Sequence, residues 1–257
     1  MQLYLTVTAA HEAQAAQLAR PLAHLCYRVG PAGRLMRNAT PRGGVMILTD
    51  AGSPSFQAPQ QLTEDILQEC RRCRYTGVLA DFTAAPEGDC RRFLTLLAEQ
   101  LRRMGKRFYV PLRWARLFPG ASVLFDTALS GGSFPQRLQQ TARELGARRL
   151  ALDLQWLRME FPLPCRSGVG RVLPPEELHG LIARETPVPL FSEALCARYF
   201  TYCAGAEHRF VLYDTEETLL KKLRLASSLG CAAAFLLYSE AEALPAFLQR
   251  IRKEKLL

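Results

Sequence analysis

Short apolar runs alternate along the chain with longer stretches in which apolar residues recur every three or four positions. The short runs are rich in Val, Leu, Phe and Tyr and predict strands, whereas the longer amphipathic stretches predict helices. The predicted strands are Leu3–Val7, Leu25–Val29, Gly44–Leu48, Gly77–Phe82, Phe108–Leu112, Ser122–Phe125, Leu150–Leu154 and Ala233–Tyr238. The predicted helices are Leu62–Cys73, Cys90–Met104, Pro135–Leu145 and Thr218–Leu229.

About eight strands that alternate with helices indicate parallel βαβ units. The runs GVLAD (77–81) and AAAFLLY (232–238) are almost entirely apolar, as expected of strands that are buried on both faces of a parallel sheet. At 257 residues, the α/β fold that we predict is a closed (β/α)₈ (TIM) barrel that forms a single domain over 1–257. A doubly wound nucleotide-binding sheet is the alternative, but neither GxGxxG nor GxxxxGK[ST] occurs in the sequence.

One segment in the C-terminal third, at about 161–212, breaks this alternation. It contains a cluster of prolines: Pro162, Pro164, Pro174, Pro175, Pro187 and Pro189. A short helix at Glu176–Ala183 and strand-like pieces at Arg198–Tyr202 and Arg209–Tyr213 are predicted within it. We therefore expect a small insertion on the rim formed by the C-terminal ends of the barrel strands, and not a separate domain.

The chain is basic, with 33 Lys+Arg against 24 Asp+Glu and a net charge of +9. Most of the cations are arginines on the predicted helix surfaces, where solvated faces and helix C-termini favour them. Neither a known nucleic-acid-binding module nor interleaved exposed aromatic residues accompany them, which argues against a nucleic-acid partner. Contact with an anionic polymer through these arginines remains an alternative.

Other classes of protein and of site find little support in the sequence. No run of about 18 apolar residues is free of charges and prolines, so we expect no membrane-spanning helix. The N-terminal MQLYLTVT has neither a basic region nor a long apolar core, so we expect a cytoplasmic protein with eight reduced cysteines. Cys70 and Cys73 form a CxxC motif without the second pair that a four-cysteine zinc site needs, and we therefore expect no metal and no cofactor.

Polar and aromatic residues follow the ends of several predicted strands, which in a barrel meet at one mouth. They are Asp50, Asp81, Arg113, Trp114, Asp126, Asp153, Tyr213, Asp214 and Tyr238. Carboxylates are costly to bury without partners, so these should share a polar mouth or pair with arginines. The aromatic residues, together with Trp156, could stack on sugar rings. The simpler interpretation of each single aspartate is that it caps the next helix or forms a local ion pair.

Four segments, which together span most of the chain, resemble the chitinase-like glycoside hydrolases of family 18. GVLADF (77–82) resembles the fourth-strand signature DGxDxDxE, and SVLFDTAL (122–129) resembles the sixth-strand Met-x-Tyr-Asp. RRLALDLQWLRMEFPLP (148–164) and the segment from Arg198 to Tyr238 are similar to the seventh-strand region and the tail of the members that act on peptidoglycan and spore cortex. The resemblance implies a (β/α)₈ barrel that takes an amino-sugar glycan, similar to peptidoglycan or chitin.

The same alignment removes the residue on which the family's chemistry depends. With Gly77 on the glycine of the signature, its three aspartates and its glutamate fall in order on Thr76, Leu79, Asp81 and Thr83. In the family this glutamate protonates the leaving oxygen while the N-acetyl group of the substrate is the nucleophile, which is an exception to the usual two-carboxylate scheme. A threonine hydroxyl cannot donate that proton near neutral pH. The final-strand tryptophan of the family's sugar pocket corresponds to Leu237 or Tyr238.

Three hypotheses follow, in order of preference. The first is a non-hydrolytic glycan-binding or scaffolding barrel, with substrate-binding residues Asp50, Trp114, Asp153, Tyr213, Asp214 and Tyr238. The second is an active hydrolase in which Glu87, in the loop after the fourth strand, replaces the missing acid and acts with Asp81 and Asp126. The third is a barrel that binds an anionic polymer through its arginines, with a steep salt dependence.

Overall fold

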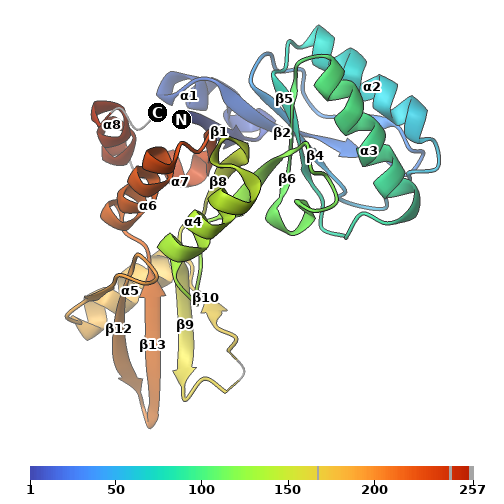
Figure 1. The fold of residues 1–257 in the computed structure, drawn as a ribbon. Helices are drawn as coiled ribbons and strands as arrows, with labels where there is room; N and C mark the ends of the chain where they lie inside the picture. Colours follow the sequence, from blue (N-terminus) through green and yellow to red (C-terminus); the bar gives the residue numbers. More distant parts are fainter. Residues whose placement is uncertain (167, 243–244, 255–257) are drawn as a thin grey trace.

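The computed structural model describes residues 1–166, 168–242 and 245–254 (Figure 1). Eight parallel strands form a closed barrel, because the first strand pairs both with the last strand and with the second. In barrel order they are β1 (Gln2–Val7), β2 (Leu22–Val29), β4 (Val45–Thr49), β5 (Gly77–Asp81), β6 (Arg107–Pro111), β7 (Ser122–Asp126), β8 (Leu150–Leu154) and β14 (Ala233–Leu237). The predicted (β/α)₈ barrel and its eight strands are confirmed.

Helices cover the outside of the barrel between most of the strands (Figure 1). They are α1 (Glu12–Leu18), α2 (Pro59–Arg72), α3 (Gly88–Arg103), α4 (Phe134–Leu145), α6 (Glu216–Leu229), α7 (Tyr238–Glu242) and α8 (Pro245–Lys253). The four predicted helices are confirmed as α2, α3, α4 and α6. The start of α2 was predicted three residues too late, because Pro59 occupies its first turn, where a missing N–H costs nothing. A short strand, β3 (Leu35–Arg37), pairs antiparallel with β2.

Two hydrophobic cores explain why the strands are apolar on both faces. One core fills the barrel with side chains that include Tyr4, Ile47, Tyr109 and Phe235, and the larger core lies between strands and helices. Gly77 stands where β5 approaches β6 closely, since an added Cβ would lie 2.6 Å from the carbonyl oxygen of Arg107. A packed barrel interior leaves the mouth as the place for polar chemistry.

A second, antiparallel sheet lies between β8 and α6 and extends away from the barrel (Figure 1). Its strands are β9 (Arg158–Leu163), β10 (Arg171–Val172), β11 (Leu190–Ser192), β12 (Ala197–Ala204) and β13 (Glu207–Tyr213), in the order β10-β9-β13-β12-β11. The helix α5 (Pro175–Glu185) packs on it through Leu178 and Leu181. The insertion predicted at about 161–212 corresponds to this sheet, which begins just after β8.

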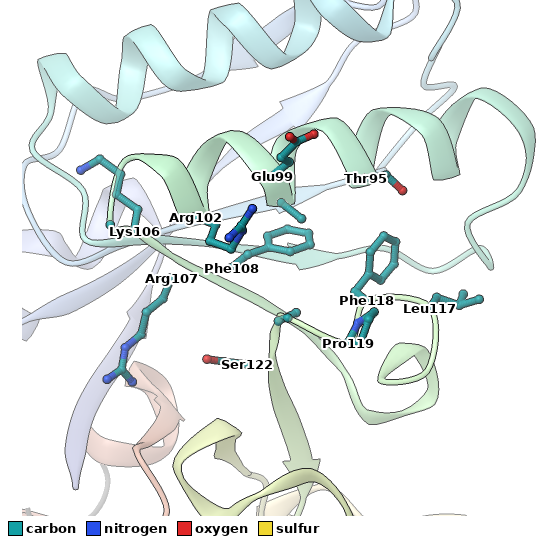
Figure 2. Close-up of a pocket in the computed structure, with 14 residues that line it drawn as sticks. Thr95, Glu99, Arg102, Lys106, Arg107, Phe108, Leu117, Phe118, Pro119 and Ser122 are labelled. Carbon is teal, nitrogen blue, oxygen red and sulfur yellow. The ribbon is translucent and has the colours of Figure 1, made fainter.

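The helical layer is interrupted between β6 and β7, where a single 3₁₀ turn (Leu112–Trp114) and a loop connect the two strands. A groove of about 510 Å³ lies there beside α3 (Figure 2). Phe108 and Phe118 form part of its lining and meet edge to face, with ring centroids 5.9 Å apart. Arg102 and Glu99 line its α3 side. The groove lies near the N-terminal ends of β6 and β7, away from the C-terminal strand ends that form the mouth.

Candidate functional site

The mouth of the barrel, at the C-terminal ends of its strands, contains two adjoining hollows of about 420 and 350 Å³. The residues that line both of them are Leu79, Asp81, Leu124, Asp153 and Gln155. The larger hollow extends to Trp156, Arg158, Leu237 and Glu240, and the smaller one extends to Arg113, Asp126 and Arg137. We refer to the two hollows together as the mouth cleft.

Strand alternation places three carboxylates in this cleft. Side chains two positions apart in a strand point to the same face. Asp81 therefore follows Leu79, and Asp153 follows Ala151, both of which are members of the barrel core. Asp126 and Asp153 are register partners on β7 and β8. The structure thus brings together three of the aspartates that we predicted at the mouth.

The three carboxylates repel one another, and the pKa of Asp153 is raised the most. Burial raises the pKa of Asp153 to about 6, and the charges of Asp126 and Asp81 act in the same direction. Gln155 opposes this shift, because its side-chain amide donates a hydrogen bond of 2.6 Å to Oδ2 of Asp153. Burial also raises the pKa of Asp81, against the attraction of the nearby Arg113. Asp153 can therefore hold its proton up to about pH 6.

Asp50 lies beside the cleft and holds the loop that follows β5. Its carboxylate accepts hydrogen bonds from the backbone N–H groups of Thr83, at 2.9 and 3.0 Å, and of Ala84, at 3.2 Å. Arg113 donates to the carbonyl of Phe82 at 2.7 Å. These bonds fix the backbone at Thr83. Asp50 was predicted to bind substrate, and its observed bonds make it a loop anchor.

Trp156 and Leu237 form part of the apolar lining of the larger hollow. Trp156 is half-buried and packs edge-on against Phe247, with ring centroids 6.2 Å apart. Its indole Nε1 has no hydrogen-bond partner within the described part of the chain. Leu237 is 46% exposed and lines the same hollow, so of Leu237 and Tyr238 it is the one that faces the cleft. On the rim, Arg158 and Glu240 form a bidentate ion pair at 2.7 and 3.1 Å.

Three aromatic residues predicted to contact substrate do not line the mouth cleft. Trp114 is only 2% exposed and packs against Phe82 in the larger core. Tyr213 belongs to the core of the second sheet, because it ends β13 and not a barrel strand. Tyr238 is buried and stacks on His11 at 5.3 Å. None of them lines either hollow of the cleft.

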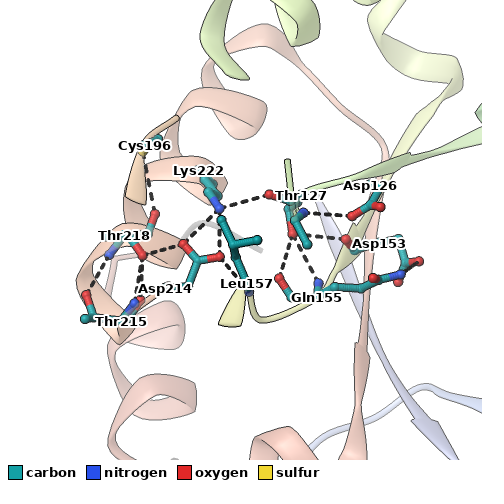
Figure 3. Close-up of polar contacts among 11 residues, drawn as sticks. Asp126, Thr127, Asp153, Gln155, Leu157, Cys196, Asp214, Thr215, Thr218 and Lys222 are labelled. Atoms are coloured by element: carbon teal, nitrogen blue, oxygen red, sulfur yellow. Dashed lines mark hydrogen bonds and ion pairs between the residues drawn. The ribbon is translucent and has the colours of Figure 1, made fainter. Parts of the chain in front are cut away.

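Asp214, also predicted to bind substrate, is instead buried in an ion pair with Lys222 (Figure 3). The ammonium of Lys222, which is fully buried, donates to both oxygens of Asp214 at 2.8 Å and to the carbonyl of Thr127 at 2.9 Å. The hydroxyl of Thr218 donates to Asp214 at 2.6 Å. Sequence reasoning missed Lys222, although Leu219, Leu223 and Ala226 place it on the buried face of α6.

Glu87, the acid proposed for an active hydrolase, is exposed and immediately precedes α3. It lines neither hollow of the mouth cleft. The structure therefore does not bring it together with Asp81 and Asp126.

Several of the arginines that could attract an anionic polymer are in ion pairs on the helix surfaces. Arg72 donates two hydrogen bonds to Glu69, and Arg103 pairs with Glu99 one turn away on α3. Arg34 pairs with Asp65.

Within residues 1–166, 168–242 and 245–254, no group of three or more His, Cys, Asp or Glu side chains is placed to hold a metal ion. No helix in that described part has the length and apolar character to cross a bilayer.

The fold and the cleft define a (β/α)₈ barrel with an acidic mouth and a second sheet inserted after the seventh barrel strand. No protein-family model matches the sequence, and no curated protein matches it by sequence. Solved structures match its fold. A chitinase from Chromobacterium violaceum superposes with a TM-score of 0.71 at 16% identity, covering 97% of this chain and 98% of the other.

Two further matches come from other organisms. The spore cortex-lytic enzyme SleL of Bacillus megaterium has a TM-score of 0.66 at 14% identity, covering 91% of this chain and 70% of the other. A mutant family-18 chitinase from Cycas revoluta, in complex with (GlcNAc)₄, has a TM-score of 0.62 at 13% identity and covers 97% of this chain and 99% of the other. The chain therefore has the fold of family-18 chitinases, which confirms the resemblance at the level of fold.

Proposed function

We propose that the mouth cleft binds an amino-sugar glycan similar to chitin or peptidoglycan, without cleaving it by the family-18 route. The observation that carries this proposal is the convergence of three carboxylates, one amide and one half-buried indole in an open cleft at the strand ends. This is the functional face of a (β/α)₈ barrel. The complex of the Cycas revoluta chitinase with (GlcNAc)₄ supports the choice of ligand class, since that protein has the same fold.

The groups in the cleft suit the chemistry of an N-acetylated sugar. Carboxylates accept hydrogen bonds from hydroxyl and amide N–H groups, and the side chain of Gln155 can both donate and accept. The ring of Trp156 and the side chains of Leu79 and Leu237 offer apolar surface for the C–H faces of a sugar ring.

The absence of cleavage follows from the residue at position 83. A hydroxyl group there cannot protonate a leaving oxygen, and loss of a general acid typically lowers the rate by about 10²–10⁴. Leu79 also takes the place of the inner aspartate of the signature. The cleft therefore retains the means of binding and lacks the family's proton donor.

Binding is tested by titrating the full chain with the N-acetylglucosamine tetramer in a calorimeter. Trp156→Ala is expected to weaken the affinity about tenfold, because it removes the indole surface from the larger hollow. Trp114→Phe is the matched control and should keep the wild-type affinity, since Trp114 is buried away from the cleft. No heat of binding for the wild-type chain, or equal affinities for the wild type and Trp156→Ala, would contradict the proposal. A steep salt dependence would favour the anionic-polymer hypothesis.

Turnover is tested separately with a fluorogenic N-acetylglucosamine oligomer. We expect no release of fluorophore by the wild type or by Glu87→Gln, because Glu87 lies outside the cleft. Wild-type turnover that disappears in Glu87→Gln would establish the hydrolase with a relocated acid.

A further inference from the structure

The segment from Gln155 to Leu157 connects barrel strand β8 to the second sheet and carries Trp156. Its two ends are held by side chains from distant parts of the sequence (Figure 3). Short connecting segments without such bonds are usually mobile. The bonds at these two ends therefore determine the position of Trp156 in the mouth cleft.

Thr127, which follows β7 and is fully buried, holds the first end. Its hydroxyl oxygen accepts a hydrogen bond of 3.1 Å from the backbone N–H of Gln155. The same hydroxyl lies 3.1 Å from the carbonyl oxygen of Asp153 and 3.2 Å from that of Gln155, to either of which it can donate. The backbone N–H of Thr127 also donates to the carbonyl of Asp153 at 3.1 Å. Thr127 thus fixes the backbone that presents both Asp153 and Gln155.

Asp214, which follows β13 of the second sheet, holds the other end. Its Oδ2 accepts a hydrogen bond of 3.1 Å from the backbone N–H of Leu157. Its own backbone N–H donates to the carbonyl of Leu157 at 2.7 Å. The residue immediately after Trp156 is therefore bonded through both of its backbone groups.

Lys222 of α6 joins the two ends. Its ammonium bonds to the carbonyl of Thr127 and to the carboxylate of Asp214 at the same time. One fully buried cation therefore ties together the ends of β7 and β13 and, through them, the segment after β8. Buried polar networks of this kind specify a single arrangement when every member has its partners.

We propose that Thr127, Asp214 and Lys222 are positioning residues that set Trp156 and Asp153 in place for glycan binding. None of the three lines the mouth cleft, so they act only through the segment that they hold. The ligand-binding part of this inference rests on the proposed function. The positional part concerns the protein alone and is measured without ligand.

The test removes the Thr127 hydroxyl and keeps the volume of the side chain. Trp114→Phe provides the background, because the chain has two tryptophans and Trp156 is then the single fluorophore. In Thr127→Val we expect greater access of acrylamide to Trp156 and an affinity for the N-acetylglucosamine tetramer about fivefold weaker, as for the loss of one hydrogen bond. Thr127→Ser restores the hydroxyl and should restore both values. Thr141→Val is the matched control, since Thr141 bonds only within α4.

Each outcome decides a different part of the inference. If acrylamide quenches Trp156 equally in wild type and in a folded Thr127→Val chain, Thr127 does not position Trp156 and that part of the inference is overturned. If the acrylamide quenching of Trp156 changes but neither the wild type nor any variant binds the tetramer, the proposed function is wrong, whereas the positioning role of Thr127 is supported. If Thr127→Val does not fold, amide hydrogen exchange of the wild type decides, because the N–H groups of Gln155 and Leu157 should be protected. Rapid exchange at both would refute the inference.

Discussion

Replacing Lys222 with methionine is expected to lower the free energy of unfolding by about 3–5 kcal/mol, the range for breaking a buried ion pair. The substitution leaves the carboxylate of Asp214 buried without its cation and leaves the carbonyl of Thr127 without its donor. Both groups would lose their interactions with the ammonium while remaining shielded from water. Urea unfolding of wild type and variant, followed by circular dichroism, measures the difference.

Two further variants separate charge from packing at this position. Lys221→Met removes the neighbouring lysine, which is exposed and lies over the ring of Phe191, and should cost about 1 kcal/mol or less. The double variant Asp214→Asn/Lys222→Met should recover part of the lost stability, because it leaves no uncompensated buried charge. A loss in Lys222→Met no larger than that in Lys221→Met would show that the ion pair is not maintained in solution.

Replacing Asp153 with asparagine is expected to stabilise the protein near neutral pH by about 2–3 kcal/mol. The pKa of Asp153 is raised to about 6 in the folded chain by burial and by the charges of Asp126 and Asp81. The folded state therefore binds the proton more tightly than the unfolded state, whose aspartates titrate near 3.9. The free energy of unfolding therefore falls as the pH rises from about 3.9 to about 6. Above about pH 6 the buried Asp153 is charged, and its whole destabilising effect is present. Asparagine cannot ionise, so the variant lacks this destabilising charge.

The pH dependence provides the control for this variant. Wild type and Asp153→Asn should be about equally stable below about pH 4, where the carboxyl is protonated in both states, and should diverge above it. Asp126→Asn should lower the pKa of Asp153, measured by the carboxyl resonance in an NMR titration, because one repelling charge is removed. If the stability difference between wild type and Asp153→Asn is the same at all pH values, the pKa of Asp153 is not raised in the folded chain.

The fold could be predicted from the sequence because each barrel strand is buried on both faces. Such strands appear as continuous apolar runs, and the Asp that ends β5, or the one that ends β7, marks the point where the strand reaches the mouth. The carboxylates of the cleft were found by the same logic, since the C-terminal ends of parallel strands converge on one face.

The aromatic residues could not be placed in this way, because nearness to a strand end does not say which way a side chain points. Trp114 lies in a 3₁₀ turn and is buried in the larger core, and Tyr213 ends a strand of the other sheet. The partner of Asp214 was also hidden, since it is a lysine eight residues further along in a different element. Only the folded arrangement shows that Lys222 connects segments that the sequence separates widely.

Closure of the barrel by its first and last strands has a consequence for synthesis on the ribosome. β1 pairs with β14 over five residues, and Tyr4 stacks on Phe235 at 5.0 Å. These contacts join the most distant parts of the sequence, whereas the hairpin of β12 and β13 is local. Pairings of such long range are slow to form. Until β14 forms, β1 and β8 therefore remain two unpaired edges of the nascent chain, and chaperone protection of these edges matters most before the barrel closes.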